Sequence, residues 1–441
     1  MPVLPRPDFF RVCARRFSPR SRAALLVALC LSAGTALTAG GASAEAKFMG
    51  SLAALPPGKD VTWGKTITLT TPDGTIGRYP RLVKVASGNH AGDLLLTYQT
   101  QLTGGDFMMY RSSDKGQSWT GPVKINDDTD QWDFASCNII QLKDGRLLMT
   151  MQRRVHGSNL GGDYFIDVRY SPDGGDSWSK PEQVFQGANW EGRAMQMPHD
   201  ANGDGVDDIY LFFTQRIIET TLTADKAKRA GDNGRGVSYI VTYDGGKTWI
   251  DPNPERYTGK MIHRNFDLRK GIGKKEDGRS GGGMPQPFLL PNNRVGFVAE
   301  EANMKHSPYI VANDPGDWDW KGAAFQGPWT SADYPGKGDR NTYPSSPQNA
   351  WPAETGSFGN GPYAAVLADG RVIMASRNEK VVAVWVGDKT AHNFKLQELP
   401  FDRTLAAYPF IEPLDGNQIL VAGGAQADGE NRILLRFGTV K

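Results

Sequence analysis

Three short stretches repeat one pattern: SSDKGQSW at 112–119, SPDGGDSW at 171–178 and TYDGGKTW at 242–249. Each copy fits [S/T]-x-D-x-G-x-[S/T]-W and follows a run of residues typical of a β-strand. The aspartate side chain accepts hydrogen bonds from the backbone of a tight turn, and the glycine tolerates a positive φ there. The final tryptophan is expected to fold back over the turn. The pattern therefore predicts three equivalent turns between strands.

A second, looser repeat consists of a short apolar strand, a turn such as D-G or N-N, and a stronger apolar strand. It begins at six places, namely Tyr79, Ala135, Arg193, Met284, Pro362 and Ala407. Three of these hairpins are followed by one of the repeated turns, which implies six four-stranded sheets. Such sheets close radially into a ring. We therefore expect an all-β, six-bladed β-propeller in which a strand at 66–71 completes the last blade.

The first 44 residues are predicted to be a signal peptide. Arginines precede the apolar run AALLVALCLSAGTAL, and Ala42-Ser43-Ala44 offers the small residues of a cleavage site. The match to a twin-arginine signal is partial, so Sec and twin-arginine export both stay open, with an uncleaved anchor helix as the alternative. We expect residues 45–441 to form the propeller, secreted or periplasmic and away from the membrane after cleavage.

Composition excludes several kinds of partner and cofactor. The 441 residues carry a formal net charge of +2 and no basic block of the kind that binds nucleic acid. Two of the three cysteines precede residue 45, so Cys137 alone remains and no intramolecular disulfide is expected. The histidines His199, His263 and His306 are isolated, which gives no support to a histidine-based metal centre. We expect a monomer that needs no organic cofactor.

The innermost strands of a propeller line its axis, so candidate catalytic groups are expected where these strands begin or where their partners end. Those places hold Arg78, Trp190-Glu191, Glu300-Glu301 and Tyr363. Two carboxylates across one cavity suit glycoside hydrolysis, because one protonates the leaving oxygen and the other attacks or activates water. A tyrosine there stabilises the transition state or acts as the nucleophile. Alternation along a strand lets only one of Glu300 and Glu301 face inward.

The repeated turns resemble the Asp-box, or BNR repeat, of the sialidase-like β-propellers. Arg78-x-Pro80 matches the first arginine of the carboxylate-binding triad of sialidases. Glu300-Glu301 stands where the second arginine of that triad is usual, and Asp106 is the counterpart of the sialidase acid. The sialidase pattern is therefore incomplete.

The chain is more similar to the exo-α-1,5-L-arabinanase propellers. That family shares the R-Y-P-R of 78–81, a glutamate after an aromatic residue (Trp190-Glu191), a glutamate ending the hairpin that starts at Gly283-Met284-Pro285, and the tyrosine of Gly361-Pro362-Tyr363. Gly192 departs from the family, which tends to have proline there. The resemblance implies catalytic Glu191, Glu300, Tyr363 and Arg78. We expect Arg81, Trp190, Asp106 and Glu301 to bind substrate.

A structural calcium site is predicted at 200–208. Oxygen-bearing side chains stand at alternate positions around a turn glycine, as in calcium-binding loops: Asp200, Asn202, Asp204 and Asp208. The twelfth position, where a bidentate glutamate is usual, is Leu211. A plain polar turn is the alternative.

These patterns together predict an exported glycoside hydrolase that acts from the end of an oligo- or polysaccharide. An exo-α-sialidase using Asp106, Tyr363 and Arg78 is the second hypothesis. The third is a carbohydrate-binding propeller without turnover, or a polysaccharide lyase, because unrelated functions share this scaffold. Insertions around 220–236, 251–280 and 315–358 are expected to form loops near the site.

Overall fold

Six antiparallel sheets account for the strands of the computed structural model. The structure describes residues 57–441 except 72–74, 76, 102–103, 127–130, 159–160, 188, 217–234, 252–282, 292, 294, 301–308, 313–359, 379–380, 390, 392–393, 402–404 and 428–429. All of the described residues belong to the unit Leu55–Lys441. The predicted signal peptide lies outside them and stays a prediction.

Five of the sheets each take their strands from one continuous part of the chain, and the sixth joins strands from both ends. The first sheet contains β2 (Arg78–Lys84), β3 (Leu94–Gln99), β4 (Phe107–Ser112) and β5 (Thr120–Lys124), and the second contains β6 (Trp132–Gln141), β7 (Leu147–Val155), β8 (Tyr164–Ser171) and β9 (Glu182–Gln186). The third contains β10 (Asn189–Gln196), β11 (Ile209–Arg216) and β12 (Arg235–Thr242), and the fourth contains β13 (Gly283–Leu289), β14 (Val295–Glu300) and β15 (Tyr309–Ala312). The fifth contains β16 (Asn360–Val366), β17 (Val372–Asn378), β18 (Val381–Val386) and β19 (Lys395–Leu396), and the sixth contains β20 (Leu405–Pro413), β21 (Gln418–Ala427), β22 (Glu430–Val440) and β1 (Val61–Thr70).

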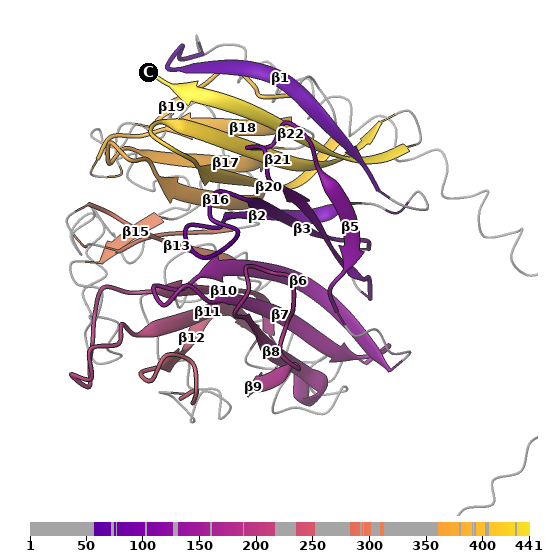
Figure 1. The fold of residues 1–441 in the computed structure, drawn as a ribbon, viewed down its shortest axis with the longest axis vertical. Helices are drawn as coiled ribbons and strands as arrows, with labels where there is room; N and C mark the ends of the chain where they lie inside the picture. The colour runs from indigo at the N-terminus through magenta and orange to yellow at the C-terminus, as the bar shows by residue number, and fades with distance from the viewer. Residues whose placement is uncertain are drawn as a thin grey trace, which may run out of the picture. The chain divides into compact units, whose positions relative to one another are not determined.

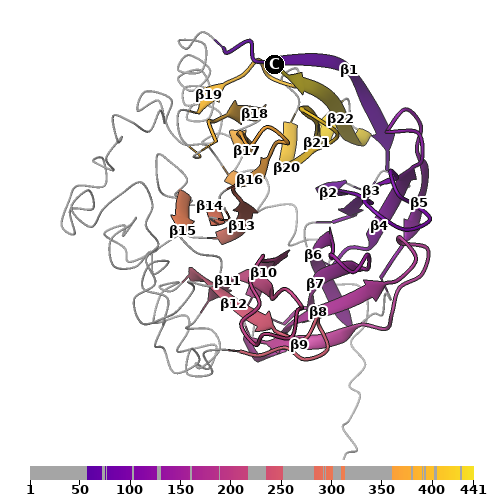
Figure 2. The ribbon, with the colours of Figure 1, turned by 60° about the vertical axis from the view of Figure 1, so that its left-hand side comes forward.

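The sheets follow one another around a ring (Figure 2). The first strands of consecutive sheets contact one another from β2 through β6, β10, β13 and β16 to β20, and β20 contacts β2 in turn. The predicted β-propeller is therefore confirmed. Four sheets have four strands, and the third and fourth show three among the described residues. The isolated bridge between Val241 and Ile250 adds one outer pairing to the third sheet.

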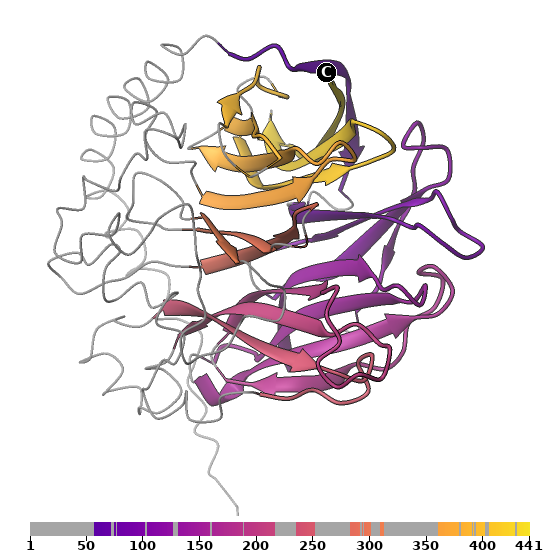
Figure 3. The same cartoon turned by 90° about the vertical axis from the view of Figure 1, so that its left-hand side faces the viewer.

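The last sheet joins the two ends of the described chain. β1 pairs antiparallel with β22, from Val61 opposite Val440 to Thr70 opposite Arg432. Figures 1 and 3 show this indigo strand beside the yellow ones. The expectation that residues 66–71 complete the last sheet is confirmed for 66–70.

The core lies between neighbouring sheets. Every residue of β3 (LLLTYQ) and β18 (VVAVWV) is buried, without the alternation expected of a half-exposed sheet. Such continuous burial follows because each middle strand is covered on both faces by the adjacent sheets. Cys137 is buried and unpaired in the cluster between the first two sheets. No helix of the described residues is long and apolar enough to cross a membrane.

The three repeated turns have the geometry that their pattern predicts. The carboxylates of Asp114, Asp173 and Asp244 each accept a hydrogen bond from a backbone amide four residues later, at 2.8, 2.9 and 2.9 Å. The side chains of Ser118 and Ser177 lower the pKa of Asp114 and Asp173 to about 2. The tryptophans pack against three successive core clusters: Trp119, Trp178 and Trp249. These turns therefore serve the scaffold.

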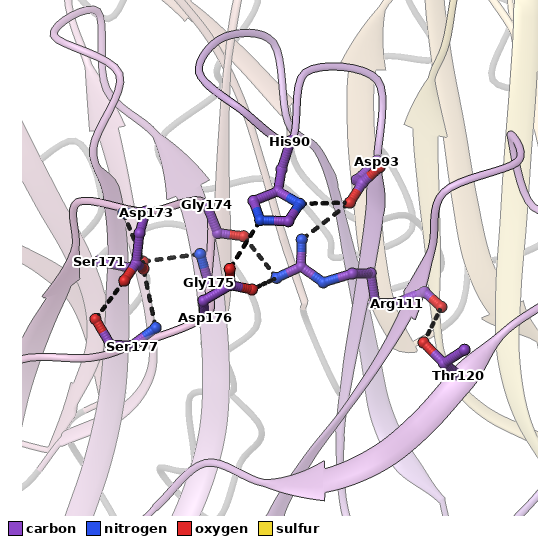
Figure 4. A network of polar contacts seen from close by, with 10 residues as sticks. All are labelled: His90, Asp93, Arg111, Thr120, Ser171, Asp173, Gly174, Gly175, Asp176 and Ser177. Atoms are coloured by element: carbon purple, nitrogen blue, oxygen red, sulfur yellow. Dashed lines mark hydrogen bonds and ion pairs between the residues drawn. The ribbon is translucent and has the colours of Figure 1, made fainter.

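The second repeated turn is also fastened to the first sheet by a polar network (Figure 4). Arg111, on β4, donates to the carbonyl oxygen of Gly174 at 2.9 Å and pairs with Asp93 and Asp176 at 3.0 and 2.8 Å. His90 contacts the same two carboxylates at 3.0 and 2.8 Å. Two sheets that are successive in the chain are thereby joined at their turn ends.

Candidate active site

Each of the six innermost strands carries a β-bulge at an equivalent position. The pairing register shifts between Arg78 and Arg81 in the first sheet and at the corresponding place in the other five. One residue in each bulge has a φ between 49° and 60°: Tyr79, Ser136, Glu191, Met284, Gly361 and Tyr408. Five of these are not glycine, although a positive φ strains other residues by about 1–3 kcal/mol. We call this set the bulge residues.

A sequence signal for the bulges exists. The residue after the positive-φ position is proline in four of the six strands: Pro80, Pro285, Pro362 and Pro409. Proline lacks an N–H and fits a strand only at an edge or a bulge. An innermost strand has an unpaired edge that faces the propeller axis. A proline whose nitrogen lies on that edge therefore removes no hydrogen bond of the sheet.

Neighbouring sheets hold the bulges in place. The Ser136 amide donates to Oε1 of Gln99 at 2.7 Å, and the Met284 amide donates to Oγ1 of Thr214 at 2.9 Å. Gln99 and Thr214 occupy matching positions on the second strands of their sheets, opposite Arg78 and Trp190. Each of these two bulges is thus fixed by a side chain of the preceding sheet.

Glu191 is the one carboxylate among the bulge residues, and Thr214 is one of its partners. The Thr214 hydroxyl donates to its Oε2 at 3.0 Å, so the same oxygen that receives the Met284 amide also orients Glu191. A methyl group on Gly192 would come within 2.9 Å of the Gln152 amide nitrogen and 3.3 Å of Leu211. The departure from proline at Gly192 therefore makes room for Gln152.

Two of the predicted substrate-binding residues lie beside these bulges. Trp190 packs at 5.2 Å from the ring of Tyr164, and the Arg154 guanidinium lies 5.1 Å from the Trp190 ring. Arg81 is 6 % exposed and lies between 5.3 and 5.7 Å from the rings of Tyr79, Tyr363 and Phe410. Burial lowers the pKa of Arg81 to about 10, while the charge of nearby Glu191 acts in the opposite direction.

Tyr363 is almost fully buried, whereas a catalytic tyrosine has to reach the substrate. Its side chain is 2 % exposed, with the Phe410 ring 4.0 Å away and the Arg193 guanidinium 4.0 Å from its ring centre. A ring enclosed in this way is suited to bracing the two arginines Arg81 and Arg193 rather than to attacking a sugar. Its catalytic role stays a prediction.

Arg193 and Glu412 were not among the predicted site residues, yet the charge of each affects the pKa of the other, from the third and sixth sheets. Arg193, on β10, donates to Oε1 of Gln286 at 2.7 Å. Burial lowers the pKa of Arg193 to about 9, and burial raises the pKa of Glu412, on β20, to about 8 despite the charge of Arg193. Both residues are half-buried.

The signal for Arg193 lies in the offset from the bulge. Arg81, Arg193 and Tyr363 all stand two residues after the positive-φ position, as do Asn138, Gln286 and Phe410. Aligning the six bulges in the sequence would have placed all six side chains together. Glu412 stands four residues after its bulge residue, where the other strands have Val83, Ile140, Met195, Phe288 and Ala365.

The remaining predicted residues lie at the same end of the sheets. Arg78 begins β2, and its Nε is buried without a hydrogen-bond partner among the described residues. Glu300 ends β14 opposite Gly283, at the register position that Gln99 and Thr214 hold in their own sheets. Asp106 pairs with Lys124 at 2.9 Å. Glu301 lies outside the described residues, as do most of the predicted insertions.

The calcium site at 200–208 stays a prediction. Asp200 accepts hydrogen bonds from the amides of Gly203 and Gly205 at 2.7 and 2.8 Å, and the Gly205 bond is the main cause that lowers its pKa. Asp208 is fully buried and contacts His199 at 2.6 Å. No group of three or more His, Cys, Asp or Glu side chains within the described ranges is placed to hold a metal. Asn202 and backbone oxygens would have to complete the site.

No protein-family model and no curated protein matches this sequence. Solved structures do. The α-L-arabinanase of Penicillium chrysogenum, complexed with arabinobiose, is 16 % identical, with a TM-score of 0.56 over 86 % of this chain and 99 % of that one. The GH93 α-L-arabinofuranosidase of Fusarium graminearum, also with arabinobiose, is 15 % identical, with a TM-score of 0.55 over 85 % and 97 %.

Two further structures extend the comparison. A protein of unknown function from Dyadobacter fermentans has a TM-score of 0.56 at 14 % identity, over 87 % of this chain and all of that one. The NanB sialidase of Streptococcus pneumoniae has a TM-score of 0.50 at 11 % identity, over 88 % and 72 %. At these identities the likeness establishes the fold: this chain is a β-propeller of the architecture that arabinanases and sialidases share.

Proposed function

We propose that this protein is a secreted, exo-acting glycoside hydrolase resembling the exo-α-1,5-L-arabinanases. One observation carries the proposal: among six equivalent positive-φ positions around the axis, a single one holds a carboxylate, Glu191, and the Thr214 hydroxyl orients it. Strained backbone that recurs around a shared axis favours a functional site over a purely structural one.

Glu191 and Glu300 are proposed as the pair of carboxylates, acid/base and nucleophile, in an order left unassigned. Their sheets are consecutive in the ring, and Thr214 links them because it contacts both Glu191 and the Met284 amide beside the Gly283–Glu300 pair. Arg81 and Arg193 place positive charge beneath this end of the sheets, where it favours an ionised carboxylate. Arg78 and Tyr363 support the site.

The substrate class rests on two supports. The arabinanase and arabinofuranosidase structures that share the fold hold arabinobiose. Trp190, half-buried against Tyr164 and Arg154, precedes Glu191 in the chain and is an aromatic residue of the kind on which sugars pack. We propose an arabino-oligosaccharide or arabinan as substrate.

The sialidase alternative rests on Arg78 and on the fold of the Streptococcus pneumoniae enzyme. Its acid would be Asp106, and the ion pair of Asp106 with Lys124 competes with that role. A carbohydrate-binding propeller without turnover, or a lyase, is the third candidate.

The test is a comparison of debranched arabinan with a fluorogenic sialoside. We expect arabinose release from the first and none from the second. Glu191→Gln and Glu300→Gln should each abolish release, whereas Asp106→Asn should retain it. Sialoside cleavage lost in Asp106→Asn would replace the proposal with the sialidase alternative, and glycan binding without any product would favour the third candidate.

A further inference from the structure

A cavity of about 650 Å³ lies between the first and sixth sheets, within the usual range for small-ligand sites. Its walls come from β1, β2, β22 and the loops that follow β4 and β20. Lys84 lines it at the end of β2, whereas Arg78 begins that strand at the candidate active site. Six residues of extended chain separate the two by roughly 20 Å. The cavity therefore belongs to the opposite end of the propeller.

Lysine and apolar side chains together line this cavity. Lys65, Lys84 and Lys115 line it together with the ring of Phe437. The one carboxylate among the lining residues is Asp415, which pairs with Lys84 and also feels the charge of Lys115. Lys65 stands in the irregularity of β1 between Trp63 and Thr66, where a bulge re-aims side chains. Three lysines against one carboxylate leave a net positive charge over an aromatic surface.

The repeated turns provide an internal comparison for Lys115. At the same position, the second and third turns have Gly174 and Gly245, with φ of 68° and 70°. Lys115 adopts a φ of 59° at the position where glycine is the strain-free choice. The fold alone would favour glycine there, and the one turn that lacks it is the turn that lines the cavity.

The first turn also differs from the other two in the residue that contacts it from the preceding sheet. Arg111 donates to the Gly174 carbonyl at 2.9 Å, and Arg146 donates to the Gly245 carbonyl at 2.8 Å, each from the preceding sheet. The first turn meets Phe437 instead: a methyl group on Gly116 would come within 2.3 Å of that ring. No arginine of the preceding sheet fills this junction among the lining residues, so space and lysine charge remain there.

We propose that this cavity binds a carboxylated sugar, a uronic acid or its short oligomer, at a site separate from the candidate active site. The C–H face of the sugar would pack on Phe437, and its carboxylate would pair with Lys115 and Lys65. Polar backbone and side chains of the loop at 115–117 suit its hydroxyls. The proposal does not depend on the hydrolase activity.

The experiment measures binding of galacturonic acid and digalacturonic acid to the full protein by calorimetry or NMR titration. We expect saturable binding that Lys115→Gly weakens at least tenfold. Because the sister turns carry glycine at this position, Lys115→Gly should melt at the same temperature as the wild type or higher. Lys247→Ala, an exposed lysine of the third turn, is the matched control and should bind normally.

Three outcomes would overturn the proposal. The first is the absence of saturable uronate binding, and the second is unchanged affinity in Lys115→Gly. The third is equal affinity for galactose or benzoate, because the first lacks the carboxylate and the second lacks the hydroxyls. Arabinan hydrolysis serves as an independent readout: it should be the same in Lys115→Gly and the wild type, whether or not the proposed function holds.

Discussion

At the turn end of the sheets, three loops repeat the backbone together with the aspartate and tryptophan side chains. At the bulge end, six strands repeat the backbone while the bulge residues themselves vary. The turn aspartates make the same hydrogen bonds in all three copies. The bulge residues share one φ but differ in chemistry, from Gly361 to Glu191. Identical side chains in identical contacts serve stability, whereas a repeated backbone with varied side chains lets each sheet bring a different group to the axis. On the proposed function, the turn end serves as scaffold and the bulge end holds the catalytic groups.

Glu191→Gln should give the largest effect at the bulge end. Loss of a positioned acid or base costs about 10²- to 10⁴-fold in rate, so kcat on arabinan should fall by that factor. Melting should change little, because glutamine can still accept from Thr214. Asp173→Asn, at the turn end, should do the reverse, with a lower melting temperature and nearly normal kcat. Equal effects of the two variants would contradict the division between the ends.

Arg193→Met should give the largest loss of stability at the bulge end. Removing one partner of an enclosed charge pair costs about 3 kcal/mol, and chemical denaturation would measure it. The loss should shrink as pH falls, because burial raises the pKa of Glu412 and removal of the Arg193 charge raises it further, so that Glu412 becomes neutral more readily. Adding Glu412→Gln should restore part of the stability. A double variant as unstable as the single one would show that the two charges do not interact.

Calcium should stabilise the turn end if the loop at 200–208 binds it. Asn202 donates to the carbonyl oxygen of Tyr243 at 3.1 Å, so ordering this loop would also support the third repeated turn. At a hundredfold excess over the dissociation constant, the gain is about 2.7 kcal/mol. Thermal melts in CaCl₂, MgCl₂ and EDTA would measure it, with Asp204→Ala as the control variant. Identical melts in CaCl₂ and EDTA would leave the plain polar turn as the explanation.

His90→Gln should produce the smallest effect, and one that depends on pH. Hydrogen bonds to Asp176 and Asp93 raise the pKa of His90, so the protonated ring favours the folded state. That contribution is complete below the unfolded pKa of about 6.5 and disappears as pH rises through the folded pKa. We expect a loss below about 1 kcal/mol at pH 5.5 and almost none at pH 9. A constant difference across this range would exclude the charge as its cause.

The turn end was readable from the sequence because its information is local. Asp114 and Trp119 lie within one turn, so spacing alone predicts their contacts. The hairpins were equally visible, and with them the propeller and the strand that completes its last sheet. The positions of Arg78 and Glu191 at the starts of innermost strands followed from the same repeat.

The side-chain contacts at the bulge end were harder to predict from the sequence, because they join residues of different sheets. Arg193 and Glu412 are far apart in the chain, and the position of each follows a register shift in its own innermost strand. Tyr363 was predicted at the opening of its strand, but β16 begins at Asn360 and the bulge carries Tyr363 inward. The choice between Glu300 and Glu301 stays a prediction, since Glu301 lies outside the described residues.

The pairing of β1 with β22 sets an order of events for folding. Five sheets are built from strands that are consecutive in the chain, and each of these can form as soon as its own segment is available. The sixth needs Val61 and Val440 side by side, which is among the longest sequence separations in the chain. Contacts of such separation form late and slowly. The same strand pair therefore closes the ring. A chain shortened at its C-terminal end would keep its repeats but not the closed ring.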